Sequence, residues 1–355
     1  MPLRHRMGRH RTGQQRAGLK TRLLAGVALA VAALAARATE VAPYFYSWGF
    51  FSNSYVANSL ANAKNAGVGA VTLAFGVSGG GCTLGGGLEE IMNDSATKAD
   101  VQNYVAAGGR VILSFGGADG QYLESACSAT AMVNLIKNVI DTQKIYNLDF
   151  DVEGSQLDQT RLTATRNTVL KQLQAAYPNL YVSFTLPAHP DGLPTDAVAL
   201  LKSTQAAGVT INIVNIIAMD YGVDGTQGRA EGTVAIASAN GTFNQLKSLY
   251  PNLSAAQIWG MIGITPMIGY NHDGAEIFTP SDATAVTRFA IHNGVGLLSY
   301  WGLQRDEAGT VNDLDRFSRV NTSNYQFYNI MKAATAPATA LNSILPAGNG
   351  PASVK

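Results

Sequence analysis

Residues 148–153 of the 355-residue chain read Leu148-Asp149-Phe150-Asp151-Val152-Glu153, an alternation of three apolar and three acidic side chains. Successive side chains of a β-strand point to opposite faces, so a strand here places the three acids on one face and the apolar side chains on the other. We therefore expect a strand whose apolar face packs outward on helices and whose acidic face points away from them.

Neighbouring acids on that face lie about 7 Å apart, where two full charges repel by roughly 2 kcal/mol at an effective dielectric constant of 20. Three such carboxylates cannot all ionise freely, so the group as a whole retains at least one proton. A proton held near neutral pH is what a general acid needs. The stretch therefore favours an acid/base catalytic site.

Two other interpretations of the acidic strand were weighed, an exposed edge strand and a divalent-metal site. A closed sheet has no edge strand, which disfavours the first. Hard cations usually recruit carboxylates from several strands, and the ends of the neighbouring predicted strands carry no comparable acids or histidines. The sequence thus predicts no metal ion.

Strand-like and helix-like patterns alternate along the rest of the chain. The predicted strands are 42–50, 70–75, 110–115, 148–152, 181–186, 211–218, 258–264 and 296–301. The predicted helices between them are 96–107, 130–143, 159–176, 196–207, 233–250 and 281–293. Eight such units favour one α/β domain over residues 39–335, a single (β/α)8 TIM barrel, with a doubly wound open sheet as the alternative. In such a barrel the strand ends near Glu153 and Trp301 lie on the face where active sites are built.

The N-terminal segment has the pattern of a secretory signal peptide. Seven Lys and Arg residues and no acid precede Leu23, and the apolar run from Leu23 to Ala36 leads into Ala36-Arg37-Ala38. Fourteen apolar residues are too few to span a bilayer, which needs about 20. We expect residues 1–38 to be removed and the mature protein to be secreted, extracellular and free of the membrane.

Removal of that leader leaves 17 basic and 24 acidic residues, a formal charge of −7. A mildly acidic domain without a basic run gives no electrostatic reason to bind nucleic acid. Residues 336–355, which are rich in Ala, Pro and Gly, have the composition of a flexible tail.

Cys82 and Cys127 are the only cysteines. In an oxidising compartment we expect one disulfide between them, with two free thiols as the alternative. The glycine-rich run 79–87 lacks the Lys and Ser/Thr of a phosphate loop and the spacing of a dinucleotide fingerprint, so no cofactor is expected.

Three further motifs lie on other predicted strands: Ser114-Phe115-Gly116-Gly117 on the third, Met219-Asp220-Tyr221 after the sixth and Trp301 at the end of the eighth. Together with the acidic strand they resemble, in order, the four motifs of the family 18 glycoside hydrolases, the chitinases. The family's strand motif ends in the catalytic acid, which matches Glu153. The resemblance covers about residues 41–332.

Other stretches are similar to the family as well. Residues 44–49 and 73–76 resemble its first and second strands, and 265–269 resembles a stretch of bacterial secreted members. There are two departures: Tyr146 and Asn147 replace the first acid and the glycine of the strand motif, and Gly222 stands where many members carry Asp. Both leave the three acids untouched.

The resemblance implies a role for each acid. Glu153 would protonate the leaving glycosidic oxygen and later deprotonate water. Asp151 would orient the acetamido group of the substrate, whose carbonyl oxygen is the nucleophile in this family. Asp149 would share a proton with Asp151, held from behind by Ser114 and Tyr44.

The resemblance also places other side chains at the substrate. Tyr221 would hydrogen-bond the acetamido carbonyl, and Trp301 would form the floor beneath a pyranose ring. The remaining residues assigned to substrate binding are Trp48, Phe75, Met219 and Asp220, of which Asp220 has loop capping as an equal alternative.

The implied function is a secreted, monomeric chitinase that hydrolyses β-1,4-linked N-acetylglucosamine polymers and oligomers with retention. The alternatives are an endo-β-N-acetylglucosaminidase acting on N-glycans and a non-catalytic chitin-binding lectin. Residues 264–296 have room for one helix and loops only. We therefore expect no large α+β insertion between the seventh and eighth strands.

Overall fold

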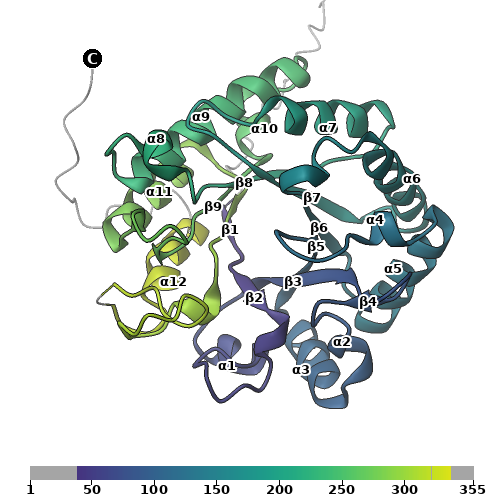
Figure 1. Ribbon diagram of the computed structural model, residues 1–355, viewed down its shortest axis with the longest axis horizontal. Coiled ribbons are helices and arrows are strands. Elements are labelled where there is room, and N and C mark those ends of the chain that lie inside the picture. The colour runs from purple at the N-terminus through teal and green to yellow at the C-terminus, as the bar shows by residue number, and fades with distance from the viewer. Residues whose placement is uncertain (1–37, 321, 337–355) are drawn as a thin grey trace, which may run out of the picture. The chain divides into compact units, whose positions relative to one another are not determined.

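Parallel strands ringed by helices form the body of the computed structural model, which describes residues 38–320 and 322–336 (Figure 1). The predicted leader 1–38 and tail 336–355 lie outside the described residues except for Ala38 and Ala336. Within the described part, no helix is both long and apolar enough to cross a membrane.

The main sheet runs in the order β1-β12-β9-β8-β7-β6-β5-β3-β2, and every pairing along this path is parallel. Its strands are β1 (Glu40–Val41), β2 (Tyr44–Tyr46), β3 (Ala70–Ser78), β5 (Arg110–Gly116), β6 (Asn147–Asp151), β7 (Tyr181–Pro187), β8 (Ile213–Ile217), β9 (Ile262–Thr265) and β12 (Leu297–Leu298). The short β4 (Leu84–Gly85) adds to β3 in the antiparallel sense.

The segment that contains β1 and β2 closes the sheet into a barrel. β1 pairs with β12 and β2 pairs with β3, and only Ala42 and Pro43 separate them. The amide of Ala42 donates to Leu298 O at 2.9 Å, while Pro43 O accepts from Thr72 N at 2.9 Å. One strand of chain therefore bonds to both ends of the sheet, which confirms the predicted eight-stranded (β/α)8 barrel.

Helices form the outer layer (Figure 1). They are α1 (Leu60–Asn65), α2 (Glu90–Asn93), α3 (Ser95–Ala106), α4 (Leu123–Ala126), α5 (Ala129–Gln143), α6 (Thr160–Ala176), α7 (Thr195–Ala206), α8 (Gly222–Thr226), α9 (Glu231–Leu249), α10 (Ala255–Trp259), α11 (Pro280–Asn293) and α12 (Gln326–Met331). Several begin as their sequences indicate. Thr279 and Asp282, for example, form a reciprocal capping box at the start of α11, with Pro280 as its first residue.

Three predicted strands extend three or more residues beyond one end of the observed ones. Residues 47–49 form a 3₁₀ turn beyond β2, and only Leu297 and Leu298 of 296–301 are assigned to β12. Ile258 belongs to helix α10, which Ser254 and Gln257 cap reciprocally. A short apolar run such as Ile258-Trp259 is compatible with a strand or a helix, and here the capping residues before it favour the helix.

The segment between β9 and α11 contains only a small antiparallel hairpin. Its strands are β10 (Gly269–Tyr270) and β11 (Ile277–Phe278). The prediction that no large α+β insertion separates the last two barrel strands is confirmed.

Inward-facing side chains divide the barrel interior into two zones. A buried apolar cluster of Ala42, Ala70, Ile112, Ile213 and Leu297 comes from early positions of their strands. Later inward positions are polar and buried: Ser114, Asp149, Ser183, Thr185, Asn215 and Thr265. The outward face of β6 is apolar, as predicted, and Phe150 packs between Phe115 and Phe184 with ring centroids 5.6 and 6.0 Å apart.

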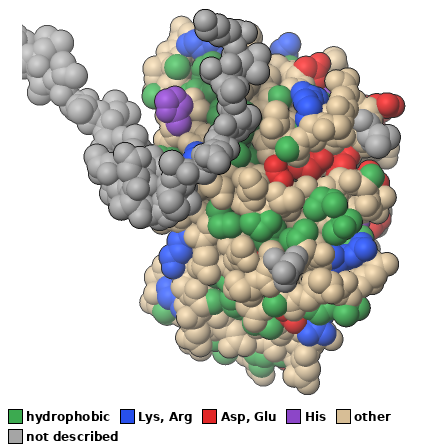
Figure 2. Space-filling model, turned by 90° about the vertical axis from the view of Figure 1, so that its left-hand side faces the viewer, with side chains coloured by type: hydrophobic (Ala, Val, Ile, Leu, Met, Phe, Trp, Pro, Cys, Tyr) green, Lys and Arg blue, Asp and Glu red, His purple; other side chains and the backbone are tan. Residues whose placement is uncertain are grey.

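The surface carries few charges, as the 14% of charged residues implies. Figure 2 shows one face on which basic side chains are scattered, while acidic side chains gather beside a band of apolar ones.

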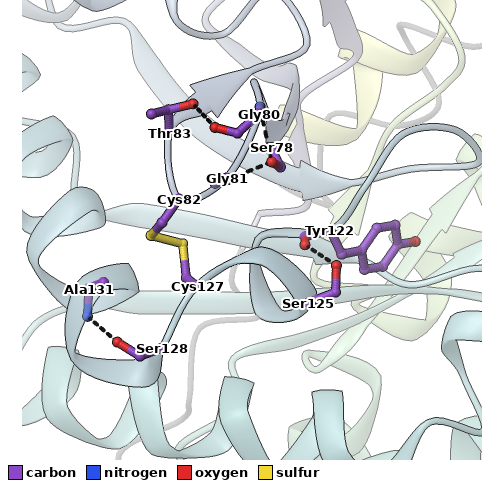
Figure 3. The surroundings of a disulfide bond; sticks show 10 residues. All are labelled: Ser78, Gly80, Gly81, Cys82, Thr83, Tyr122, Ser125, Cys127, Ser128 and Ala131. Carbon is purple, nitrogen blue, oxygen red and sulfur yellow. Dashed lines mark hydrogen bonds between the residues drawn. A yellow bond between two sulfur atoms is a disulfide. The ribbon is translucent and has the colours of Figure 1, made fainter.

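Cys82 and Cys127 form the predicted disulfide, which is confirmed with a Cα–Cα distance of 4.7 Å. It joins the glycine-rich turn between β3 and β4 to the end of α4 (Figure 3). The same turn is held by Ser78, whose hydroxyl donates to Gly81 O at 2.6 Å. The glycine run is therefore an anchored turn.

We expect the Cys82→Ser, Cys127→Ser double variant to unfold more easily than the wild type. The bridge spans a sequence separation of 45, and the chain-entropy model assigns about 4 kcal/mol to a loop of that size. Denaturant unfolding of both proteins with and without reductant checks this. If the wild type loses no stability on reduction, the bridge does not constrain the unfolded chain.

Candidate active site

Asp149 lies in the barrel interior and is surrounded by hydroxyl groups. Its carboxylate oxygens lie 2.7 Å from Ser114 Oγ, 2.6 Å from Ser183 Oγ, 3.0 Å from Thr185 Oγ1 and 3.2 Å from Tyr44 Oη. Burial raises the pKa of Asp149, while these hydroxyl groups oppose the rise because they stabilise the ionised form. The predicted contacts of Ser114 and Tyr44 with this acid are present.

The hydrogen-bond network around Asp149 extends across strands β7, β8 and β9. Asn215 Nδ2 donates to Thr185 Oγ1 at 3.0 Å, and Thr265 Oγ1 donates to Asn215 Oδ1 at 2.8 Å. Sequence reasoning missed Ser183, Thr185 and Asn215. Each stands at an inward position of an otherwise apolar strand, and such a position marks a buried polar network.

Asp151 is the last residue of β6 and is buried, yet its Oδ1 has no hydrogen-bond partner among the described residues. Its pKa is raised well above the ordinary value, first by burial and then by the charges of Glu153 and Asp149. A buried carboxyl oxygen without a partner is costly, which marks the position as one that serves a ligand or a proton.

Glu153 lies two residues beyond Asp151, past the end of β6, with an extended backbone at φ −128° and ψ 165°. Burial is the main cause that raises its pKa to about 7. The charges of Asp220 and Asp119 raise that pKa further, while a hydrogen bond with Asp151 and the charge of His272 lower it.

The ionisation of Asp151 and that of Glu153 depend on each other, since each is among the causes that shift the pKa of the other. Hydroxyl groups oppose the rise of the pKa of Asp149, whereas the pKa of Asp151 is raised well above its ordinary value. These directions favour a proton held at the outer two acids. The proton shared by Asp149 and Asp151 that the resemblance implies stays a prediction.

Aromatic side chains cover the same end of the barrel. The Trp301 ring lies 5.6 Å from Phe75 with 14° between the planes, and 5.7 Å from Tyr44. Tyr46 stands 4.6 Å from Trp301 and stacks on Trp48 at 4.9 Å. Trp48 is 48% exposed, so the row leads from the buried acids to solvent.

The motif after β8 lies beside helix α9. The hydroxyl of Tyr221 lies 3.0 Å from Ser238 Oγ on α9, and no hydrogen bond joins it to the three acids in the described residues. Met219 is half-buried beside it. The roles of Tyr221 and Met219 at a substrate thus stay predictions.

Asp220 forms a pair with His272, to which the sequence had assigned no role. Asp220 accepts from His272 N at 2.9 Å and lies 2.7 Å from His272 Nδ1. This contact raises the pKa of His272. Asp220 therefore caps the loop between β10 and β11, which is one of the two roles considered for it. The charges of Asp220 and His272 both shift the pKa of Glu153.

The two departures from the family pattern lie apart from the acids in different ways. Tyr146 precedes β6 at its opposite end, is 39% exposed and packs edge-on against Tyr177. Asn147 begins the strand and bonds Val111 O and Arg110. Gly222 begins α8 at φ +73°, where an L side chain would be strained.

Within the described residues, no group of three or more His, Cys, Asp or Glu side chains could hold a metal ion.

Comparison with known proteins supports the fold and the family to which the motifs point. The chain is 32% identical over 275 residues to the "Probable bifunctional chitinase/lysozyme" of Escherichia coli strain K12, covering 74% of this chain and 31% of that protein. It is 32% identical over 267 residues to "Endochitinase 11" of Metarhizium anisopliae, covering 72% and 51%. The chain thus spans about a third to a half of these curated relatives. No family model matches it.

Solved structures give a match over nearly a whole domain. Active domain 2 of a thermostable chitinase from Pyrococcus furiosus, whose catalytic-site mutants were crystallised with chito-oligosaccharides, is 30% identical with a TM-score of 0.71. The match covers 84% of this chain and 94% of that chain.

We expect the stability of the wild type to fall as the pH rises from about 5 to 8. A carboxyl group whose pKa rises on folding, here from 4.5 to about 7 for Glu153, stabilises the fold below the lower value and loses that contribution as the pH passes the higher one. Glu153→Gln removes the ionisation, so its melting temperature should exceed that of the wild type by several degrees more at pH 8 than at pH 5. Thermal unfolding across this range checks it, and parallel curves for the two proteins would contradict it.

Proposed function

The chain belongs to the chitinases of glycoside hydrolase family 18, and on that premise we propose that it hydrolyses β-1,4-linked N-acetylglucosamine polymers and oligomers with retention. The observation that carries the proposal is the placement of Asp151, with its buried unpartnered oxygen, and of Glu153 at the end of β6, beside the aromatic row. Glu153 is the proton donor and acceptor of this reaction.

The first step cleaves the glycosidic bond. The carbonyl oxygen of the substrate's 2-acetamido group attacks C1 while the bond from C1 to the leaving oxygen breaks, and Glu153 transfers its proton to that oxygen. The product is a cyclic oxazolinium ion on the retained sugar. A pKa of about 7 keeps Glu153 protonated enough to donate in neutral or mildly acidic solution.

Asp151 stabilises the charge that develops in this step. When Glu153 gives up its proton, the Oδ1 of Asp151 is available to accept the acetamido N–H, because no protein donor occupies it. This contact orients the carbonyl for attack and places a carboxylate next to the positive ring. Asp149, with its hydroxyl donors, supplies a fixed negative charge behind Asp151.

The second step restores the acid. Glu153, now ionised, removes a proton from water, whose oxygen attacks C1 and opens the oxazolinium ring. Two successive inversions at C1 leave the β configuration unchanged. No second carboxylate is needed as nucleophile, although most other glycosidases use one.

The aromatic row supports the sugar rings. Trp301 and Phe75 lie nearly parallel next to Tyr44, which contacts Asp149. Flat indole and phenyl faces match the apolar faces of pyranose rings. The exposed Trp48 extends this surface outward, and we propose that it binds a sugar farther along the chain.

We also propose that the protein is exported and works as an extracellular monomer. The basic and apolar pattern of residues 1–38 supports export. The Cys82–Cys127 bridge supports it too, because such bonds persist in oxidising compartments.

The reaction is tested with the N-acetylglucosamine pentamer and hexamer, wild type and Glu153→Gln, all on residues 39–355. Mass spectrometry follows the products and NMR identifies the new anomer. We expect β-anomeric products from the wild type and a rate at least 1,000-fold lower for the variant, since loss of a general acid costs about 10²–10⁴-fold and the same residue acts in both steps.

Each alternative gives a different result in the same assay. Binding of intact hexamer without cleavage would indicate a lectin, while cleavage only of a glycoprotein's N-glycans would indicate an endo-β-N-acetylglucosaminidase. Release of α-anomers would contradict the substrate-assisted mechanism. Equal rates for the two proteins would remove Glu153 from its role.

A further inference from the structure

Strand pairing on the side of β5 ends at Asp151, before it reaches Glu153. The last paired residues are Gly116 and Asp151. At Gly116 and Gly117 the φ angles are +105° and +94°, and a Cβ on Gly116 would lie 2.0 Å from Asp151 O. Glycine is required here because the backbone turns away from β6 at very close approach. The amide of Glu153 is thereby left without a strand partner on this side.

The hydroxyl group of Tyr122 fills that place. Glu153 N donates to Tyr122 Oη at 3.1 Å. The phenol proton is in turn donated to two backbone carbonyls, Gly117 O at 2.9 Å and Asp151 O at 3.0 Å. The phenol oxygen therefore stands where the next backbone hydrogen bond of the ladder would be. It connects the backbone on both sides of the carboxyl groups of Asp151 and Glu153.

The ring itself is held firmly in position. Tyr122 is buried and immediately precedes α4, and Ser125 donates from both N and Oγ to Tyr122 O, at 3.0 and 2.8 Å. At the other end of α4, Cys127 is bonded to Cys82 (Figure 3).

Two more contacts fix α4 from the sides. The buried Glu124 pairs with Arg166 of α6, and Ser78 N donates to Gln121 O at 2.7 Å. The side chain of Tyr122 thus connects helix α4, which the disulfide holds in place, to the backbone at the end of β6.

We propose that Tyr122 is a positioning residue for the hydrolysis described above, one that fixes the backbone of Asp151 and Glu153 so that their carboxyl groups keep their positions relative to each other. The inference rests on the proposed function, because its effect is measured through that reaction. A displacement of about 1 Å at reacting groups lowers rates by roughly 100-fold. Loss of the hydroxyl also leaves a buried amide without a partner, which favours such a displacement.

Tyr104 provides a matched control. Like Tyr122 it is buried, its pKa is raised by burial, and its hydroxyl donates to a backbone carbonyl, that of Val68 at 3.0 Å. It lies on α3 and contacts none of the three acids. Tyr104→Phe therefore removes a comparable hydrogen bond away from the site.

The experiment compares wild type, Tyr122→Phe and Tyr104→Phe with the hexamer. We expect similar losses of thermal stability in both variants. In Tyr122→Phe, kcat should fall 10- to 100-fold with KM within threefold, and the alkaline limb of the kcat profile should move to lower pH because the pair holds its proton less tightly. Tyr104→Phe should keep kcat within twofold and the limb unchanged.

Equal kcat values and pH limbs for the two variants would overturn the proposal. An inactive wild type would instead contradict the proposed function, so the two failures are distinguishable. Hydrogen exchange of the Glu153 amide in the wild type provides a test that does not depend on folding of a variant. We expect it to be strongly protected, and exchange as fast as that of an exposed loop amide would refute the hydrogen bond to Tyr122.

Discussion

The close placement of three carboxyl groups, two buried on β6 and one half-buried just beyond its end, is the constraint on which the rest of the site depends. Asp149, Asp151 and Glu153 cannot all be ionised in a barrel interior, because each charge is poorly solvated and repels the next. Their surroundings differ. Hydroxyl groups surround the innermost acid, whereas the pKa values of the outer two are raised, and one oxygen of Asp151 has no hydrogen-bond partner among the described residues.

The different surroundings of the three acids result from the distribution of apolar and polar side chains in the barrel interior. Apolar side chains fill the early inward positions, so the acids cannot be hydrated from below. Polar positions on β5, β7, β8 and β9 supply donors at the depth of Asp149 and none to Oδ1 of Asp151. The retained proton is thus presented at the end of the strands, next to Trp301 and Phe75. The same arrangement explains why a carboxyl with a pKa of about 7 occurs at Glu153.

Local sequence patterns were sufficient to predict the barrel and the acidic strand. Alternation across 148–153 placed the acids inward, and two cysteines in an exported chain indicated their bond. The hydroxyl groups around Asp149 could not be predicted, because Ser183 and Thr185 lie about 35 residues away in sequence.

Other features were missed for the same physical reason. The hydrogen bonds of Tyr122 exist only because the chain leaves the sheet at Gly116 and Gly117. The contact of Tyr221 with Ser238 of α9 was not foreseen either, and the predicted contact of Tyr221 with substrate stays a prediction. Pairs of this kind are set by packing between distant elements, on which a single sequence carries little information.

The proton held at the outer two acids is tested most directly by following the side-chain carboxyl carbons of Asp151 and Glu153 by ¹³C NMR as the pH of the free wild-type protein is raised. The account predicts a coupled titration of the two resonances, in which the pair keeps one proton until the pH reaches about 7. Complete ionisation of both carboxyl groups below pH 5 would contradict it.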